Sequence, residues 1–269
     1  MKNFKSKLFA LISTLFLVAC GGGGGDSSSS SSSTPATTSY TGVGSTVINL
    51  DWSTHTNPDG SSHQTIVNNI ILETAPGATL VPVTYSGNNG GSTNWISVIS
   101  STLAGMTSGQ IINISAFSGS SSSGQISNNN PPNILISLSA GNNGNPTLNY
   151  SEVAALYNSS YKSGLILVGA LGADGNIASW SSTAGAGADR FVVTDPKCTG
   201  TIYSGTSCSA PRVAGDAAII KQKYPNATGS QIAAAILNTA VLKSGWDPAI
   251  YGKGQVDITA ALNYLGTSK

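Results

Sequence analysis

From residue 46 onward, short apolar runs alternate with stretches in which apolar residues recur every three or four positions. An apolar run of four to eight residues between turn residues is typical of a buried strand, whereas a spacing of three or four predicts a helix with one apolar face. The first pattern predicts strands at residues 46–50, 79–85, 110–115, 133–139 and 164–170. The second predicts helices at residues 63–72, 94–103, 151–157, 207–224, 228–238 and 258–265.

The order of these elements indicates the fold class. Helices separate most of the successive strands, and parallel strands joined through a helix form βαβ units. We therefore expect an α/β fold with a mostly parallel central sheet and helices on both faces. In such folds functional side chains gather at the carboxyl ends of the strands.

The first 37 residues do not follow this alternation. Three lysines within the first seven residues precede the apolar stretch 8–18, and the segment ends in a Leu-Val-Ala-Cys sequence at Cys20. Because this stretch is too short to span a bilayer comfortably, we expect residues 1–20 to be a cleaved export signal. The sequence before Cys20 resembles a bacterial lipobox, which implies that Cys20 carries a lipid anchor. An ordinary secretory signal with an incidental cysteine is the alternative.

Glycine and serine dominate residues 21–37, which cannot bury apolar surface. We expect a flexible tether there and one folded domain at residues 38–269. The glycine directly after Cys20 implies, by resemblance to known lipoproteins, a place in the cell envelope of a Gram-negative bacterium. The domain would be lipid-anchored to the outer membrane and would face either the periplasm or the outside.

The charge balance argues against nucleic acid as a partner. The chain has 12 Lys and Arg residues against 11 Asp and Glu residues, and three of the lysines lie in the export signal. Removal of the signal leaves nine basic against eleven acidic residues, a net charge of −2, which supplies no basic surface. The two histidines and three cysteines show no metal-type clustering. We therefore expect no metal or cofactor, and the sequence offers no ligand cluster for a structural calcium ion.

A run of small residues with a central serine stands where a loop is predicted to enter a long helix. The run reads Gly-Thr-Ser-Cys-Ser-Ala-Pro-Arg-Val-Ala-Gly, from Gly205 to Gly215. A serine at a helix N-terminus faces backbone N–H groups and the positive end of the helix dipole, which can stabilise an oxyanion. Ser207 is therefore the candidate nucleophile. We expect Pro211 to fall in the first helical turn, where a missing N–H costs little.

A serine nucleophile requires a base within hydrogen-bonding reach. His63 opens a predicted amphipathic helix, whereas His55 lies in a polar loop and is better explained as a solvated surface residue. The carboxylate that orients the base should stand at the end of an upstream strand. Asp51 directly follows the strand predicted at residues 46–50, whereas its competitor Asp59 precedes a glycine and is typical of a turn.

These motifs together resemble those of the subtilisin-like serine peptidases, or subtilases. The serine motif is similar over many consecutive positions, and the His-Gln-Thr-Ile-Val sequence at His63 resembles their His-Gly-Thr-His-Val. The resemblance covers about residues 43–265 and implies a three-layer subtilisin-like fold in which Asp51, His63 and Ser207 form a catalytic triad. Asn142, in the Ala-Gly-Asn sequence after a predicted strand, would complete the oxyanion hole.

The same resemblance implies a groove for an extended peptide between two segments that follow predicted strands. Phe117 stands where the family commonly has glycine, which implies a narrower groove. The two segments consist of Ser115, Ala116 and Phe117, and of Leu138, Ser139, Ala140 and Gly141.

Two cysteines remain after Cys20, namely Cys198 and Cys208. An exported protein meets an oxidising compartment, so a disulfide between them is one expectation. The other is a small, buried Cys208 without a bond, and the sequence does not decide between the two.

We therefore expect a serine endopeptidase that hydrolyses peptide or protein substrates through an acyl-enzyme intermediate. It would act as a monomer held to a membrane by its lipid. Departures from the family motifs at Trp52, Gln64, Ile66 and Phe117 favour an alternative, a subtilase-fold binding or structural lipoprotein with weakened catalysis. An esterase that uses the same residues is a third hypothesis.

Overall fold

The computed structural model describes residues 39–52, 60–85, 94–116, 124–126 and 130–267. Residues 39–269 form one compact unit. The predicted export signal with Cys20 and the predicted tether lie outside the described residues, as do His55, Asp59 and Phe117. Among the helices that are described, none combines the length and the apolar character that crossing a bilayer requires.

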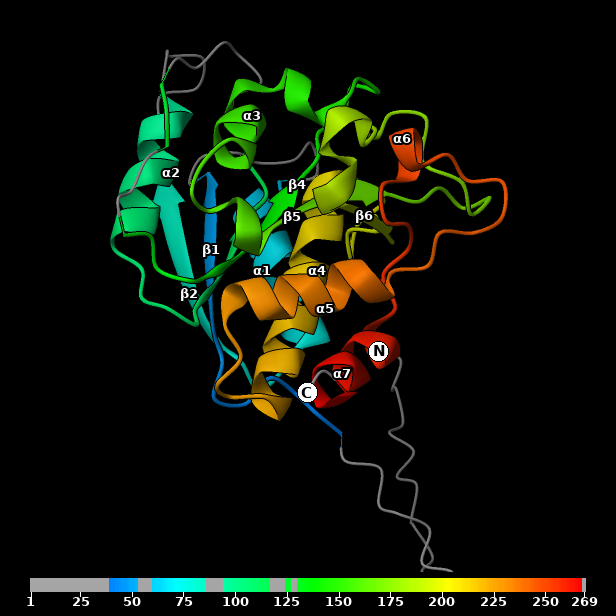
Figure 1. Cartoon of the computed structure of the whole chain (residues 1–269). Helices are drawn as coiled ribbons and strands as arrows, with labels where there is room; N and C mark the ends of the chain where they lie inside the picture. Colours follow the sequence, from blue (N-terminus) through cyan, green and yellow to red (C-terminus); the bar gives the residue numbers. More distant parts are fainter. Residues whose placement is uncertain (1–38, 53–59, 86–93, 117–123, 127–129, 268–269) are drawn as a thin grey trace, which may run out of the picture. The chain divides into compact units, whose positions relative to one another are not determined.

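Within the described ranges, the centre of the fold is a six-stranded sheet in which all neighbouring strands are parallel (Figure 1). The strands lie in the order β2-β1-β3-β4-β5-β6. This sheet confirms the predicted α/β class. The strands are β1 (Thr46–Trp52), β2 (Thr79–Tyr85), β3 (Ile111–Ile114), β4 (Leu135–Ser139), β5 (Leu165–Ala170) and β6 (Phe191–Thr194).

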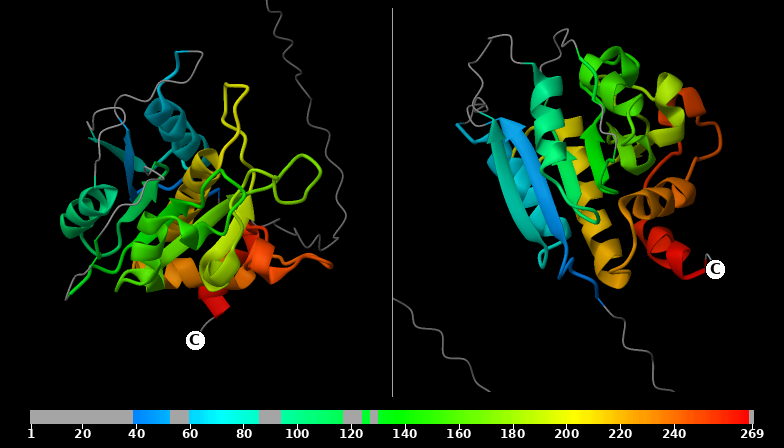
Figure 2. Two further views of the ribbon diagram at one scale, coloured as in Figure 1. Left: turned by 90° about the horizontal axis from the view of Figure 1, so that it is seen from above. Right: turned by 60° about the vertical axis from the view of Figure 1, so that its left-hand side comes forward.

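Helices cover both faces of the sheet (Figure 2). One face packs against α2 and α3, with a contribution from α6, and the other packs against α1, α4, α5 and α7. Short 3-10 turns connect several elements. The α-helices are α1 (His63–Thr74), α2 (Trp95–Ala104), α3 (Ser151–Tyr157), α4 (Thr206–Lys223), α5 (Gly229–Thr239), α6 (Pro248–Tyr251) and α7 (Ile258–Thr267).

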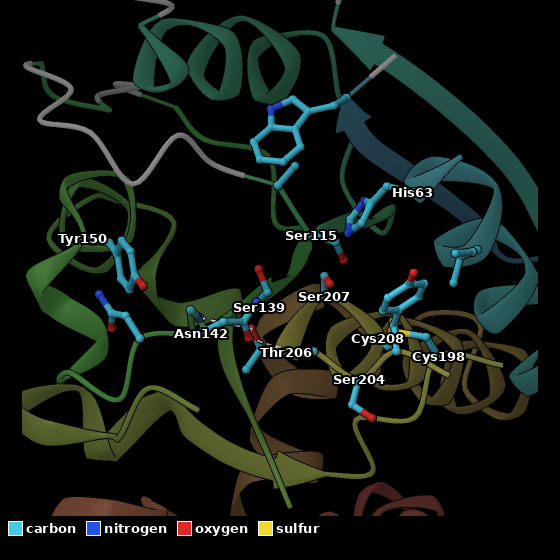
Figure 3. A pocket seen from close by; sticks show the side chains of 17 residues that line it. His63, Ser115, Ser139, Asn142, Tyr150, Cys198, Ser204, Thr206, Ser207 and Cys208 are labelled. Carbon is cyan, nitrogen blue, oxygen red and sulfur yellow. Dashed lines mark hydrogen bonds between the residues drawn. A yellow bond between two sulfur atoms is a disulfide. The ribbon is translucent and has the colours of Figure 1, made fainter. Parts of the chain in front are cut away.

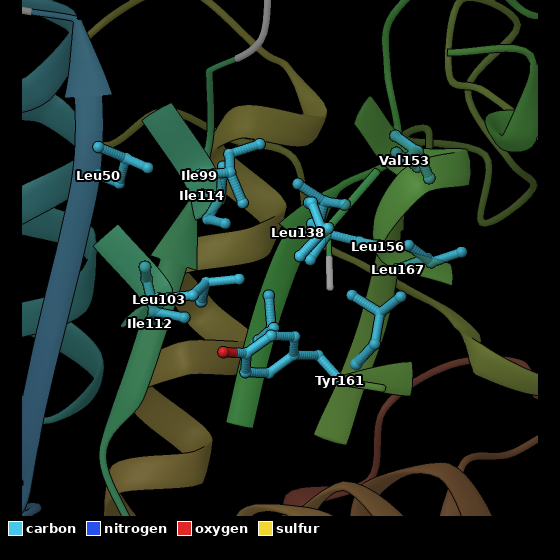
Figure 4. Close-up of a cluster of buried hydrophobic side chains, with 14 of the residues drawn as sticks. Leu50, Ile99, Leu103, Ile112, Ile114, Leu138, Val153, Leu156, Tyr161 and Leu167 are labelled. Atoms are coloured by element: carbon cyan, nitrogen blue, oxygen red, sulfur yellow. The ribbon is translucent and has the colours of Figure 1, made fainter. Parts of the chain in front are cut away.

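Large aliphatic side chains fill the space between the sheet and the layer of α2 and α3 (Figure 4). Ile99 and Leu103 of α2 belong to the same buried cluster as Leu50, Ile114 and Leu138 of the strands. Each such side chain contributes about 1.5–3 kcal/mol when it is fully buried. This layer therefore supplies much of the stability of the sheet that carries the site.

The opposite face depends on small residues, which allow α1 and α4 to approach each other closely. A Cβ atom at Gly215 of α4 would lie 2.5 Å from the Cβ atom of Thr74 in α1. Only glycine fits this contact without a shift of one helix. The close packing fixes the relation between α1, which starts at His63, and α4, which starts at Thr206.

Buried hydrogen bonds connect these helices to the strands. Asn113 of β3 donates to Asn49 of β1 at 2.8 Å, and Asn49 donates to Asn68 of α1 at 2.8 Å. Ser137 of β4 donates to the carbonyl of Ala210 in α4 at 2.8 Å. Because directional bonds hold both helices on the sheet, the starts of α1 and α4 are fixed relative to the ends of the strands.

Strand β2 forms one edge of the sheet, since its only sheet neighbour in the described part of the chain is β1. Pro82 lies in the middle of β2, in register with Asn49 of β1. A proline cannot donate to a strand ladder, so it is tolerated at an edge rather than in a central strand. Val81 beside it is 40% exposed.

Candidate active site

The structure brings Asp51 and His63 together at the carboxyl end of β1. His63 Nδ1 lies 2.9 Å from each of the two carboxylate oxygens of Asp51. The Asp51 side chain is fully buried, whereas that of His63 is 14% exposed. A carboxylate in this position keeps the proton on Nδ1 and fixes the plane of the ring. Nε2, on the other edge of the ring, is then the nitrogen that can accept a proton.

The backbone also orients the Asp51 carboxylate. The N–H of Trp52 donates to Asp51 Oδ1 at 2.8 Å. The Trp52 ring lies beside the imidazole of His63, with 6.2 Å between the two ring centroids, and makes an edge contact with Trp95. The residue that departs from the family pattern after Asp51 therefore forms an aromatic wall next to the candidate base.

Ser207 is the second residue of α4 and lies two positions after the N-cap Gly205, whose backbone is extended at φ −170°. Its N–H belongs to the first helical turn, where backbone N–H groups lack helical acceptors. Pro211 is buried in the sixth position of the same helix. The expectation that Pro211 falls in the first turn was therefore wrong. Since Pro211 has no N–H, it cannot donate the usual helical bond to the carbonyl of Ser207.

His63 and Ser207 line the same pocket, which has a volume of about 430 Å³ (Figure 3). The walls of the pocket come from the end of β1, the start of α1, the residues after β3 and β4, and the loop that leads into α4. The candidate base and the candidate nucleophile, 144 positions apart by their residue numbers, thus meet at one rim of the sheet.

Asn142 lines this pocket as well, and Thr206 fixes its side chain. Asn142 Oδ1 accepts from the N–H of Thr206 at 2.9 Å and from Thr206 Oγ1 at 2.9 Å. Because these bonds use the amide oxygen, Nδ2 is the end that can donate to a ligand. A Cβ atom at Gly205 would lie 3.1 Å from Ser207 Oγ and 3.6 Å from Asn142 Nδ2. Both atoms therefore border the space left by the missing side chain of Gly205.

The structure divides the residues of the predicted groove into two groups. Ser115, Ala116, Ser139 and Gly141 line the pocket. Leu138 and Ala140 do not, because successive side chains alternate and both are fully buried in the core on the α2 and α3 side. Their side chains are therefore not available to a ligand in this pocket. Phe117, and with it the predicted narrowing, lies outside the described residues.

A disulfide joins Cys198 and Cys208, whose Cα atoms are 5.2 Å apart. Both residues line the pocket, although their exposed fractions are only 6% and 1%. Of the two expectations for these cysteines, the structure contains the bonded form.

Other pocket residues were not singled out from the sequence. Thr206 belongs to the serine motif, but the motif does not indicate its bond to Asn142, which joins segments 64 residues apart. Tyr150 packs against Gly141, where φ is +107° and a side chain has no space. Tyr203 stands in the loop before α4. A tyrosine in a predicted loop gives no signal that it lines a pocket.

The described side chains include no group of three or more His, Cys, Asp or Glu residues that could hold a metal ion. The polar groups that line the pocket are instead one imidazole, hydroxyl groups and amides, and the buried carboxylate of Asp51 lies behind the imidazole. This set can transfer a proton and stabilise an oxyanion.

Comparison with known proteins finds similar sequences and similar folds. The model of the subtilase family matches residues 41–254. A thermostable alkaline protease of Halalkalibacterium halodurans is 33% identical over 240 residues, with 79% of this chain and 60% of the relative covered. Subtilisin E of Bacillus subtilis is 32% identical over 238 residues, with 77% of this chain and 58% of the relative covered.

Subtilisin DY of Bacillus licheniformis is 36% identical over 136 residues, which cover 48% of this chain and 46% of the relative. The matches thus span about half to three fifths of the length of these three relatives. Among solved structures, a protease of Pseudoalteromonas arctica superposes with a TM-score of 0.60 at 22% identity and covers 84% of this chain and 91% of its own. A cold-adapted subtilisin-like serine proteinase reaches 0.56 at 20% identity, with 81% and 88% covered.

The likeness to these structures shows the fold, and the match to the family model extends over most of the domain. This chain belongs to the subtilase family.

Proposed function

We propose that this chain is a serine endopeptidase in which Ser207 is the nucleophile, His63 the general base and Asp51 the group that orients the base. The observation that carries the proposal is the contact of His63 Nδ1 with both Asp51 oxygens at 2.9 Å, on the wall of the pocket that Ser207 also lines. The names of the relatives, which are proteases, support the same reaction class.

The reaction follows from the chemistry of these groups. Ser207 Oγ attacks the carbonyl carbon of a peptide bond while its proton passes to His63 Nε2. Negative charge on the carbonyl oxygen is stabilised by Asn142 Nδ2 and the N–H of Ser207. The tetrahedral intermediate collapses when the C–N bond breaks and His63 gives its proton to the leaving amine. A water molecule, deprotonated by His63, then hydrolyses the acyl-enzyme and restores the Ser207 hydroxyl.

A peptide substrate would lie along Ser115, Ala116, Ser139 and Gly141, which border the pocket beside Ser207. These segments continue from β3 and β4, whose pairing reaches Ile114 and Leu138. An extended peptide can use the backbone groups beyond that point as a strand uses a sheet edge.

A serine-reactive fluorophosphonate probe tests the proposal with the full chain. We expect the probe to label Ser207, as mapped by peptide mass, and a library of peptides to be cleaved. Ser207→Ala should remove both the labelling and the cleavage. A folded protein with an unlabelled Ser207 and no cleavage would contradict the peptidase and favour the weakened binding protein. Cleavage of esters alone would favour the esterase.

The proposed acyl transfer draws its acid, base and oxyanion donors from the chain itself. We therefore propose that activity needs no cofactor and persists after dialysis against a calcium chelator. A loss that added calcium restores would contradict this. We also propose a monomer, to be checked by light scattering.

Lipid anchoring through Cys20 is a further part of the proposed function, supported by the lipobox-like sequence and the Gly/Ser-rich tether after it. The N-terminal peptide of the mature protein should then have the mass of an acylated cysteine, and the protein should fractionate with the outer membrane. Protease access in intact cells distinguishes the periplasmic from the outer face. Fractionation of wild type and Cys20→Ser alike with soluble proteins would contradict the anchor.

A further inference from the structure

A small apolar cluster lies between the two helices that carry the candidate base and nucleophile. Ile66 and Ile70 of α1 are buried together with Cys198 and Cys208, and Tyr203 packs against them. Ile66 lies one helical turn after His63, and Cys208 directly follows Ser207. The cluster is therefore in contact with both helices near their reactive ends.

The loop that precedes α4 is held at its base by hydrogen bonds. Arg212 donates to the carbonyl of Asp195 at 3.2 Å and to that of Lys197 at 2.7 Å. The N–H of Gly205 donates to the carbonyl of Pro196 at 3.1 Å. These bonds fix the two ends of the loop against α4, but not the segment between them.

The outer part of the same loop forms a wall of the pocket. Cys198, Tyr203 and Ser204 line it, whereas Ile202 between them is 94% exposed and has no packing of its own. The N–H of Cys198 donates to the carbonyl of Tyr203 at 3.1 Å, so that the two residues move together. Besides the main chain, which enters α4 after Ser204, a second covalent link joins this wall to α4, namely the bond between Cys198 and Cys208.

We infer, on the basis of the proposed function, that the Cys198–Cys208 disulfide is a positioning element that holds the pocket wall and the Ser207 helix in register with the His63 helix. Its reductive cleavage lowers turnover reversibly while the domain stays folded. The bond closes a loop with a sequence separation of 10. Closure of so short a loop contributes only a part of the stability of a domain. The main consequence of reduction is therefore a change in geometry.

The reduction requires an external dithiol. Its thiolate attacks one sulfur of the Cys198–Cys208 bond, the S–S bond breaks, and the other cysteine leaves as a thiolate that takes up a proton. The second thiol of the reagent then attacks the reagent's own sulfur in the mixed disulfide and releases the remaining protein cysteine as a thiol. The products are two protein thiols and one cyclic disulfide, so two electrons and two protons reach the protein. Both cysteines line the pocket, which gives the reagent its route.

The first experiment compares the oxidised full chain with the same protein reduced by dithiothreitol. Peptide mapping after alkylation establishes reduction of Cys198 and Cys208 separately from Cys20. We expect kcat for a peptide amide to fall by about 10- to 100-fold, because small displacements of reacting groups have effects of this size. KM should change less than about threefold, and reoxidation should restore kcat. An unchanged kcat after complete reduction would overturn the inference, as would a loss of kcat that only follows the unfolded fraction measured by circular dichroism.

The variant Cys198→Ala with Cys208→Ala provides the matched control. It should have the kcat of the reduced wild type and should not respond to dithiothreitol. Should this variant fail to fold, the reduced wild type still provides the measurement. A folded double variant with the kcat of the oxidised wild type would contradict the positioning role.

A readout that does not depend on turnover separates this inference from the proposed function. The chain has two histidines, so a His55→Gln variant assigns the imidazole ¹⁵N resonances of His63. We expect reduction to shift the His63 resonances in the folded protein. Unchanged His63 resonances would overturn the inference even for an inactive protein. A shift in a protein that neither cleaves peptides nor reacts with the fluorophosphonate would overturn the proposed peptidase and leave the positioning intact.

Discussion

The two sides of the pocket are built differently. On the histidine side, defined by Asp51, Trp52 and His63, one buried carboxylate holds the imidazole through contacts at 2.9 Å across a sequence separation of 12. On the serine side, defined by the loop 195–205, the start of α4 and Asn142, the parts come from distant segments. The hydrogen bond between Thr206 and Asn142 and the Cys198–Cys208 disulfide hold them, and the missing side chain of Gly205 leaves space between them.

This difference predicts how strongly single substitutions on each side should lower activity. Orientation on the histidine side depends on one group, so a single change there should remove most of the activity. On the serine side several contacts share the positioning of Ser207, so single changes among these positioning contacts should have graded effects. Three of the four predictions below test this contrast in kcat, and the one on Asp216 tests the stability of the helix that carries Ser207.

The largest effect is expected from Asp51→Asn. An amide in place of the carboxylate favours the wrong tautomer of His63, and kcat should fall by about 10⁴-fold with little change in KM. Steady-state kinetics on a peptide amide measures it. Asp59→Asn is the matched control, because Asp59 is the competing carboxylate in the sequence. A larger loss in Asp59→Asn than in Asp51→Asn would contradict the assignment.

Next comes Asn142→Ala, which removes the amide that Thr206 orients. The loss of one oxyanion donor should lower kcat by about 10²–10³-fold. The neighbour Asn143 also borders the pocket, but its Oδ1 accepts from the N–H of Asn145 at 3.0 Å. Asn143→Ala should therefore reduce kcat far less. Equal losses in the two variants would remove the oxyanion role from Asn142.

A third prediction concerns pH and the stability of α4, the helix that carries Ser207 at its start. Burial raises the pKa of Asp216 in α4 from 3.8 to about 7, although the nearby Arg212 acts in the opposite direction. Between these two values the folded state holds a proton that the unfolded chain has lost, so the free energy of unfolding falls as pH rises from about 4 to about 7.

Asp216→Asn should remove this slope. The Asp216 residue keeps part of its surface in contact with water, which weakens the effect of burial. We therefore expect the free energy of unfolding of the variant to exceed that of wild type by about 2 kcal/mol at pH 8 and by almost nothing at pH 4. Urea unfolding at several pH values measures the difference, and kcat should stay within about twofold. If the free energies of unfolding of the two proteins changed in parallel with pH, the carboxyl group would not titrate in this range.

The smallest effect is expected from Gly205→Ala. The extended backbone of Gly205 suits any residue, but the new methyl group would lie 3.1 Å from Ser207 Oγ. We expect kcat to fall by about three- to tenfold without a loss of melting temperature, since the change crowds reacting groups and not the core. Gly105→Ala, with ordinary contacts and φ −84°, is the control and should leave kcat unchanged. A larger loss of kcat than that of Asn142→Ala would contradict the graded effects expected on the serine side.

Much of the fold follows from local patterns. The strand at residues 79–85 and the helix at residues 151–157 were predicted to the residue as β2 and α3. β1 extends two residues beyond the predicted strand because pairing with Thr84 and Tyr85 continues through Asp51 and Trp52. β6 was missed, since its four residues are too few for a periodic signal and their place depends on pairing with β5.

The site, like the fold, has parts that the sequence could predict and parts that it could not. The approach of Asp51 to His63, and of His63 and Ser207 to one pocket, was predictable, because each residue stands at a strand end or a helix start of a parallel sheet. The bond between Thr206 and Asn142 and the approach of Cys198 to Cys208 were not, because they depend on distances between segments that sequence spacing does not determine.

The proline in β2 affects how copies of this protein meet. An exposed sheet border with a continuous row of donors and acceptors can recruit a strand from another molecule and start an aggregate. Pro82, in the middle of β2, breaks that row of donors. If the proposed lipid anchor crowds many copies onto one surface, this interruption protects them from joining border to border, and it does so without any charge at that position.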